Sequence, residues 1–199
     1  MTTAPTEGRA RPGGRAARVV EAVHGAAFSL LDEVGYERLQ LPDVAERAGV
    51  NKTTVYRRWP TKVALVADLL SALMQSSVAA PDTGSIQTDL EVLLTEVADV
   101  LTSRALRSVL RAAMTLGDDD PSVRQAQRDF FDERFRLSGV IVDRAVMRRE
   151  LPDTTDPRRF LELAASPIYF RVLFAAEPVG KDEIRELAAT AIRAHRETP

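Results

Sequence analysis

The residues best suited to recognition chemistry are hydrogen-bond donors between positions 52 and 57. Lys52, Thr53 and Thr54 are consecutive, and Arg57 follows about one helical turn later. Lysine and arginine can bond to the O6 and N7 acceptors of guanine, and a threonine methyl group can contact thymine. None of the four side chains is acidic, so the set suits contacts to the base edges of double-stranded DNA.

Two short helices joined by a tight turn are expected to position these donors. The first covers residues 43–48, and Gly49 can adopt the positive φ that closes a helix without strain. Asn51 is a suitable N-cap for the second helix, residues 52–59, which Pro60 ends. The pattern predicts a helix-turn-helix, in which the first residues of the second helix face the major groove.

The residues around this motif resemble the N-terminal domain of TetR-family transcriptional repressors. The resemblance covers about residues 16–66 and keeps the family's order and spacing in Gly35-Tyr36-Glu37, Pro42 to Lys52, Val55 to Lys62, and Ala64-Leu65. Three positions depart from the family pattern. Gln40 stands where a capping Ser or Thr is usual, Trp59 where Phe is commoner, and Val63 where Glu is commoner. A lost cap typically costs about 1 kcal/mol, which should not prevent folding.

The resemblance also implies which residues contact the DNA backbone. Phosphate contacts are expected from Tyr56, Arg58, Thr61 and Lys62, and such contacts set register and affinity rather than sequence preference. Tyr56 is expected to pack against the core as well, whereas Trp59 is expected only to pack.

The first 15 residues are rich in glycine and proline and are expected to be flexible. Four arginines lie in this segment and just after it, with no acidic residue between them: Arg9, Arg11, Arg15 and Arg18. The segment is interpreted either as a basic arm that follows the DNA backbone or enters the minor groove, or as a solubilising tail.

Composition and charge argue against several other classes of protein. The absence of cysteine excludes disulfides, thiolate zinc sites and thiol nucleophiles. His24 and His195 are the only histidines and lie far apart in the sequence, so we expect no metal site and no cofactor. No apolar run suits a signal peptide or a bilayer span, which leads us to expect a cytoplasmic protein with no membrane partner.

The charge is distributed unevenly along the chain. The net charge is −2, and it divides into +2 for residues 1–80 and −4 for residues 81–199. A slight basic excess on the motif half is what a DNA-reading domain fused to an acidic body would show.

The rest of the chain predicts an all-α fold of about nine helices. The expected domains are an arm (1–15), a three-helix helix-turn-helix domain (16–60) and a helical regulatory and dimerisation domain (61–199). Asp118, Asp119 and Asp120 could suggest a metal or phosphate cluster, but Asp120 as an N-cap before Pro121 explains them better. Pro167 is expected to kink the helix predicted for residues 157–176.

A single helix-turn-helix contacts too few base pairs to find one site in a genome, so a homodimer on a palindromic operator is expected. The helix at 157–176 is apolar on several faces, and the TetR resemblance also implies dimerisation through the last two long helices. The candidate interface residues are Leu163, Phe170, Leu173, Phe174, Ile184, Leu187 and Ala191. Each of them could instead belong to the core of one chain.

The TetR resemblance further implies a small-molecule pocket among the body helices, whose occupation shifts the fourth helix and releases DNA. The candidate lining residues are Met114, Phe130, Phe131, Phe135, Met147 and Tyr169. Aromatic and Met residues at helical spacing are also ordinary core residues. The effector expected is apolar or amphipathic.

Three other functions are weighed against a repressor. No motif in the sequence supports an enzymatic function, because the chain has no nucleophile elbow or phosphate loop. An all-α interaction module without DNA binding is disfavoured by the intact Lys52, Tyr56 and Lys62. A transcriptional activator of the same fold stays open, since the sign of regulation depends on where the operator lies.

Overall fold

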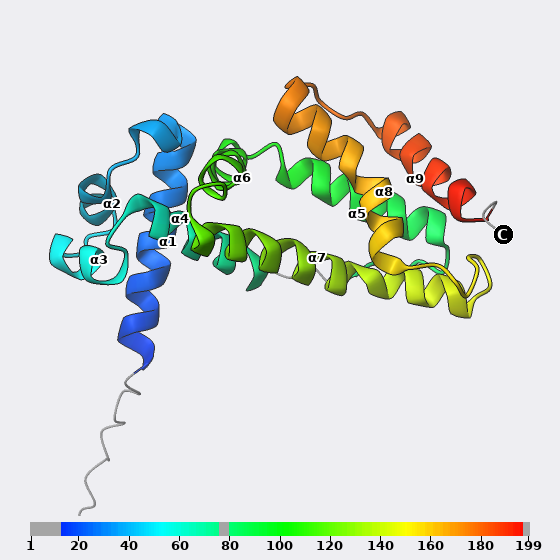
Figure 1. Ribbon diagram of the computed structural model, residues 1–199, viewed down its shortest axis with the longest axis horizontal. Coiled ribbons are helices and arrows are strands. Elements are labelled where there is room, and N and C mark those ends of the chain that lie inside the picture. Colours follow the sequence, from blue (N-terminus) through cyan, green and yellow to red (C-terminus); the bar gives the residue numbers. More distant parts are fainter. Residues whose placement is uncertain (1–12, 76–79, 197–199) are drawn as a thin grey trace, which may run out of the picture.

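The computed structural model describes residues 13–75 and 80–196, and these form nine α-helices and one π-helix with no strand among them (Figure 1). In chain order the elements are α1 (Gly13–Arg38), α2 (Leu41–Arg47), α3 (Lys52–Arg58), α4 (Lys62–Gln75), α5 (Ile86–Val100), α6 (Arg104–Leu116), α7 (Pro121–Met147), α8 (Pro157–Tyr169), the π-helix η1 (Phe170–Ala175) and α9 (Lys181–Arg196). The all-α prediction is confirmed. No helix in the described part of the chain is long and apolar enough to cross a membrane.

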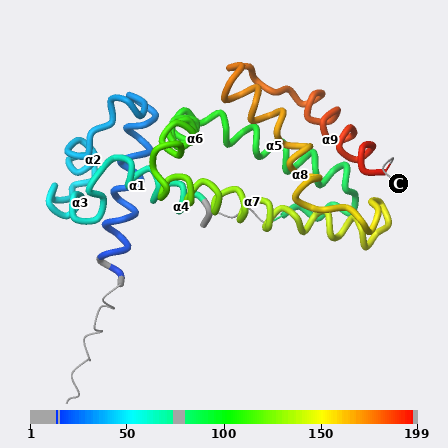
Figure 2. The backbone as a smooth tube through the Cα atoms, viewed as in Figure 1, coloured from blue at the N-terminus to red at the C-terminus, as the bar shows by residue number. Residues whose placement is uncertain are grey.

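The first three helices gather at one end of the molecule, and α5, α8 and α9 lie toward the other (Figures 1 and 2). The long helix α7 runs between the two ends and packs along α4. A second connection is made by α6, which packs against α1. The N-terminal helices are therefore joined to the body through both α4 and α6.

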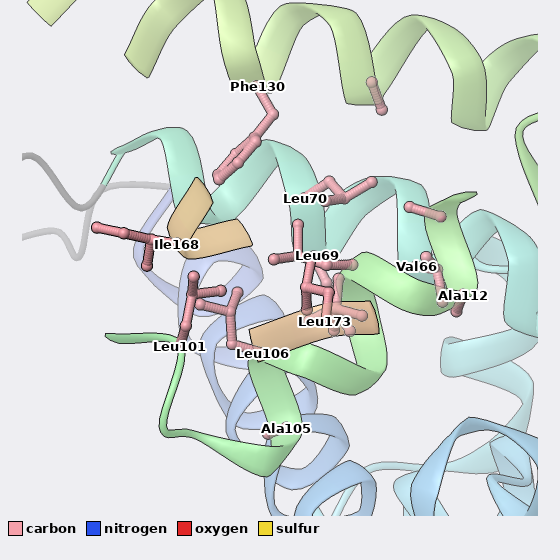
Figure 3. Close-up of a cluster of buried hydrophobic side chains, with 14 of the residues drawn as sticks. Val66, Leu69, Leu70, Leu101, Ala105, Leu106, Ala112, Phe130, Ile168 and Leu173 are labelled. Carbon is pink, nitrogen blue, oxygen red and sulfur yellow. The ribbon is translucent and has the colours of Figure 1, made fainter. Parts of the chain in front are cut away.

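One apolar core links these connecting helices to the body (Figure 3). Val66, Leu69 and Leu70 of α4 are fully buried, and they lie in the same cluster as side chains of α6 and α7. Leu173 of η1 and Ile168 of α8 enter this cluster from the C-terminal end of the chain. Because such interiors are close-packed, a shift of one helix must displace its neighbours.

Helix ends follow the capping residues in the sequence. The Asp120 carboxylate accepts a hydrogen bond from the backbone N–H of Ser122 at 2.8 Å, which confirms the N-cap interpretation. Hydrogen bonds from the Ser122 hydroxyl and N–H hold the pKa of Asp120 below its ordinary value. Gln40 makes no side-chain capping bond at α2, in agreement with the weakened cap expected there.

Two helices differ from the sequence-based expectation. Helix α1 begins at Gly13, inside the predicted arm, so the first turn is helical despite its glycines. Helix α8 continues through Pro167 and then widens into η1, a π-helical segment of six residues. Pro167 lacks a backbone N–H donor, so it predicts a disturbed helix. It does not specify that the helix becomes a π-helix.

A buried carboxylate fixes the linker between α4 and α5. Asp89 is fully buried and accepts hydrogen bonds from the backbone N–H and the hydroxyl of Thr83 at 2.6 and 2.7 Å. The guanidinium of Arg148, just after α7, lies 3.4 Å from Asp89 and also bonds to Glu150. Glu150 in turn accepts from the N–H of Ile86 at 2.7 Å. The linker after α4 is thus tied to the far end of α7.

Candidate nucleic-acid interface

The helix-turn-helix is built by short-range interactions. Gly49 has φ +63°, and the N–H of Val50 bonds back to the carbonyl of Ala45 at 2.9 Å. The side chain of Asn51 caps α3 by accepting from the N–H of Thr53 at 2.9 Å. The turn and the N-cap are therefore those that the sequence predicts.

Helix α3 separates apolar from polar side chains. Val55 is fully buried and Trp59, at the end of the helix, is 2% exposed, so this stripe faces the core. Lys52, Thr53 and Arg57 are exposed, and Thr54 is half-buried. Within the described residues, neither Lys52 nor Arg57 takes part in an ion pair, so their charges are available to an outside partner.

The Thr53 hydroxyl is already engaged within the chain. It donates to the Asn51 side-chain oxygen at 2.8 Å, which fixes the orientation of Thr53 at the start of α3. Its remaining lone pairs and its methyl group are the parts of the side chain that stay open to a ligand.

The four residues expected to contact phosphates lie around the end of α3 and the start of α4. Tyr56 is 45% exposed, and the Arg58 guanidinium lies over the Trp59 ring at 5.3 Å. The Thr61 hydroxyl accepts from the N–H of Ala64 at 3.1 Å and so caps α4. These four residues are near neighbours in the chain, and they lie beside the donors of α3.

Lys62 has a structural role that the sequence did not reveal. Its ammonium group donates to the carbonyls of Tyr36 and Glu37 at 3.4 and 3.3 Å and lies 4.5 Å from the centre of the Tyr36 ring. These carbonyls follow Gly35, whose φ of +77° breaks the helical path of α1. Burial, with the charge of Glu37, raises the pKa of the Tyr36 hydroxyl. The phenol whose ring lies beneath the Lys62 ammonium therefore stays protonated.

A hydrogen-bonded junction connects α1, α3 and α4. The Trp59 indole N–H donates to Asp68 Oδ2 at 2.7 Å, and His24 Nε2 lies 3.0 Å from the same oxygen. The His24 and Trp59 rings are 6.0 Å apart. Asp68 was not among the residues predicted from the sequence, although one signal was present: Trp in place of the usual Phe adds an N–H that must find an acceptor when buried.

The basic arm is only partly placed. Arg9 and Arg11 lie outside the described residues, and Arg15 belongs to α1, although its side chain is not described. Arg18 is exposed on α1, where its Nε donates to the carbonyl of Gly14 at 3.1 Å.

Comparison with known proteins identifies the family. The sequence profile described as "Bacterial regulatory proteins, tetR family" matches residues 25–69, and "Tetracyclin repressor-like, C-terminal domain" matches residues 80–191. The HTH-type transcriptional regulator AqdR of Rhodococcus erythropolis is 33% identical over 156 residues, which are 78% of this chain and 75% of that protein. The chain belongs to the TetR family of transcriptional regulators.

Solved structures of transcriptional regulators share the fold. TetR family transcription regulator SCO0332 is 25% identical, has a TM-score of 0.70, and is matched over 88% of this chain and 97% of that one. The regulator FadR of Bacillus subtilis, solved in complex with stearoyl-CoA, is 13% identical with a TM-score of 0.59, over 89% of this chain and 97% of that one. The helix-turn-helix described above is therefore the DNA-binding motif of a TetR-family protein.

In this TetR-family chain, three of the residues expected to line a pocket meet between α5, α7 and α8. Phe131, Phe135 and Tyr169 line one hollow, with the Phe131 and Tyr169 rings 5.7 Å apart. This aromatic hollow has a volume of about 30 Å³, room for little more than one water molecule. Burial raises the pKa of Tyr169, so its hydroxyl remains neutral.

The other three expected pocket residues lie elsewhere. Phe130 is 7% exposed and belongs to the main core, and Met114 is half-buried against the same core. The expectation for Met147 is wrong, because its side chain is 75% exposed at the end of α7. Met147 is the last residue of α7 and is not among the residues that line the aromatic hollow.

The candidate dimer residues divide into two groups by burial. Leu163, Phe170 and Phe174 are 46%, 62% and 64% exposed, and the two phenylalanine rings stack at 6.0 Å. Leu187 is half-buried. Leu173, Ile184 and Ala191 are at most 9% exposed and pack inside their own chain. These last three are core residues in this structure and cannot form the surface of a dimer without rearrangement.

Proposed function

We propose that this chain is a homodimeric repressor that binds a palindromic operator and releases it when a small apolar or amphipathic molecule binds the C-terminal domain. The observation that supports DNA reading most directly is the division of α3. Val55 and Trp59 anchor the helix, while Lys52, Thr53 and Arg57 are exposed beside it. Base contacts are assigned to these three residues and Thr54.

Phosphate contacts are assigned to Tyr56, Arg58, Thr61 and Lys62. The Lys62 ammonium has three donors, and two bonds to backbone carbonyls leave one for a phosphate oxygen. Contacts to the DNA backbone or the minor groove are assigned to the arginines of the N-terminal arm as well. Together these contacts would orient α3 without selecting a sequence.

Dimerisation is assigned to the exposed apolar residues near the end of α8 and in η1. Large aromatic side chains exposed together are unusual on a monomer and typical of interfaces. Phe170 and Phe174 form such a pair, with Leu163 two helical turns earlier. The surface of α8 and η1 is therefore the one on which we expect two copies to meet.

Effector release is assigned to the aromatic hollow or its surroundings. The present volume of about 30 Å³ is far below the roughly 300 Å³ that encloses a small ligand, so binding must move helices apart. FadR, which shares the fold, was solved with stearoyl-CoA. Since α4 and α7 pack together and α4 bonds to Trp59, such movement would reach α3.

Selection of binding sites from a random duplex library by the purified full-length chain tests the proposal. We expect the enriched sites to be inverted repeats, bound by two copies of the chain in analytical ultracentrifugation. Enrichment of sites without dyad symmetry, or no enrichment over a Lys52→Ala/Arg57→Ala double variant, would contradict it. A reporter gene placed behind the selected site then tells repression from activation.

A further inference from the structure

A second hollow lies between the end of α5, helix α6 and the turn that follows η1. Its volume is about 480 Å³, within the range of small-molecule sites and much larger than the aromatic hollow. One wall is apolar and includes Leu101, Val172, Pro178 and Val179. The other wall carries the guanidinium groups of Arg107 and Arg111, so the hollow is amphipathic.

The two guanidinium groups are held in place by backbone carbonyls. Arg107 Nη1 donates to the carbonyls of Leu101 and Thr102 at 2.8 and 2.6 Å. Arg111 Nη2 donates to the carbonyl of Leu173 at 2.9 Å. A guanidinium has five N–H donors, so each arginine keeps several that these bonds do not use. The two residues are one turn apart on α6 and therefore on one side of it.

No carboxylate of the described residues forms an ion pair with either arginine. Two acidic residues, Asp99 and Glu177, also line the hollow. Glu177 is paired with Arg171 at 3.4 Å, which leaves Asp99, within the described part of the chain, as the one acid without an ion pair there. Arg171 also pairs with Glu183 at 2.7 Å, so what the hollow offers an anion is not a surplus of charge but two guanidinium groups with which no described carboxylate is paired. Arginine can hold a carboxylate by two parallel bonds.

The backbone at the rim of the hollow is unusual. Ala176 has φ +57° and ψ +32°, a left-handed conformation that is rare for a residue with a side chain. It directly follows η1, and π-helical segments are frequent at functional sites. Val172 and Ala176 line the hollow, whereas Phe170 and Phe174 of the same segment carry the exposed aromatic pair.

Helix α6 also connects the hollow to the DNA-binding domain. The carboxylate of Asp32, on α1, accepts from the N–H of Ala105 at 3.1 Å, and Arg104 donates to the carbonyl of Glu33 at 3.3 Å. Arg107 follows within the first turn of the same helix. A ligand that pulls on Arg107 and Arg111 would therefore act on a helix whose first turn is bonded to α1.

We propose that this hollow is an effector site for a small amphipathic monocarboxylate. The carboxylate bonds to the guanidinium groups of Arg107 and Arg111, and the apolar part lies against Leu101, Val172 and Val179. Occupation shifts α6 relative to α1 and weakens operator binding. The last step rests on the proposed function, whereas the binding step does not.

Titration calorimetry of the full-length chain with octanoate, and with octan-1-ol as an uncharged probe of equal chain length, tests the site. We expect octanoate to bind in the millimolar range or tighter and octan-1-ol at least about ten-fold more weakly, since a charge-assisted bond is lost. Arg111→Gln removes the charge of the guanidinium and should weaken octanoate binding by a similar factor. Arg128→Gln, an exposed arginine on α7 outside the hollow, should leave it unchanged.

Ala98→Trp provides a second variant that does not depend on the arginines. Ala98 lines the hollow, so a large ring there should block octanoate. Equal binding of the two probes, or binding that survives both Arg111→Gln and Ala98→Trp, overturns the site, as does no binding of octanoate. Circular dichroism melting shows that each variant is folded.

Operator affinity of the wild-type chain, measured with and without octanoate, tests the consequence. We expect octanoate to lower the affinity in wild type and not in Arg111→Gln. Arginine-dependent binding that leaves operator affinity unchanged overturns the effector role. A failure to bind any operator without octanoate would instead count against the proposed function, and calorimetry would still decide the site.

Discussion

Most side chains of α3 are either buried in the core or exposed to solvent, and few are intermediate. Val55 and Trp59 are buried, Lys52 and Arg57 are exposed, and only Thr54 is intermediate. This division follows from the helical period, in which residues three or four apart share a face. The buried and exposed positions of this helix could therefore be predicted from the sequence alone.

Arg57→Ala should reduce discrimination between operator and random DNA. If the side chain reads a base edge, its loss costs about 1–3 kcal/mol at the specific site and less elsewhere. Fluorescence anisotropy with the selected operator and a scrambled duplex at several salt concentrations measures both affinities. Arg136→Ala, an exposed arginine on α7, is the charge-matched control. Equal losses on both duplexes would reassign Arg57 to the phosphate backbone.

At the level of elements, the α3–α4 junction contains one hydrogen bond that a phenylalanine at position 59 could not form. Trp59→Phe keeps most of the buried ring and removes only the donor to Asp68. We expect a loss of about 1 kcal/mol in the free energy of unfolding, since Asp68 is partly exposed. Urea unfolding measures this loss, and operator affinity should fall with it.

A double-mutant cycle separates that bond from the change in ring size. The second substitution is Asp68→Ala. The loss of stability in the double variant should be smaller than the sum of the losses in the two single variants, because each single substitution already removes the same bond. Strict additivity would show that Trp59 acts through packing alone.

The linker at the far end of α7 should respond to acid. Burial alone would raise the pKa of Glu150, but hydrogen bonds from Ile86 and Arg148 and the charges of Arg148 and Arg196 outweigh it, so the pKa is lowered. A carboxyl with a lowered pKa in the folded state stabilises the fold above its unfolded pKa, near 4.5, and this contribution is lost as pH falls through the folded value.

Glu150→Gln should therefore destabilise the chain at neutral pH and flatten the fall of stability below about pH 4.5. Thermal melts across this range measure the effect. Glu133→Gln is a useful comparison, because Glu133 also has a lowered pKa but bonds only within α7. An unchanged slope in Glu150→Gln would remove Glu150 from the acid response.

Elements with local signals were predicted well, and those that depend on distant contacts were not. Gly49, Asn51 and Asp120 act within a few residues of themselves, so their turns and caps can be read from the sequence. The π-helix after Pro167 is bonded to α6 through Arg111 and to α9 through the Arg171–Glu183 pair, and no short motif encodes these contacts. Apolar periodicity marks a buried face but not what covers it, and this is why Leu173, Ile184 and Ala191 were grouped with the exposed Phe170 and Phe174.

At the scale of the whole molecule, the exposed aromatic pair predicts assembly. Phe174→Glu places a charge on the surface proposed to join two copies, so the dimer should dissociate to monomers at micromolar concentration and operator affinity should fall sharply. Sedimentation velocity measures the first effect and anisotropy the second. Val140→Glu, at an exposed valine on α7, should change neither. A dimer that survives Phe174→Glu would place the interface elsewhere.

Among the described residues, α4 and α6 each connect the DNA-binding end of the molecule to its body. A ligand in the aromatic hollow between α5, α7 and α8 would act mainly on the connection through α4. A carboxylate bound in the second hollow would act mainly on the connection through α6. The two sites could then be distinguished by which contact to α1 each disturbs: Asp68 with His24, or Ala105 with Asp32.

The junction at Trp59 makes the first connection optically observable. This is the only tryptophan in the chain, and it lies 2% exposed where α3 meets α4, with its indole N–H on a carboxylate. Tryptophan emission therefore comes from one known place, and no dye or label is needed to follow it. Stopped-flow mixing with operator or effector would record when α4 moves relative to α3, and so whether that movement precedes or follows DNA release.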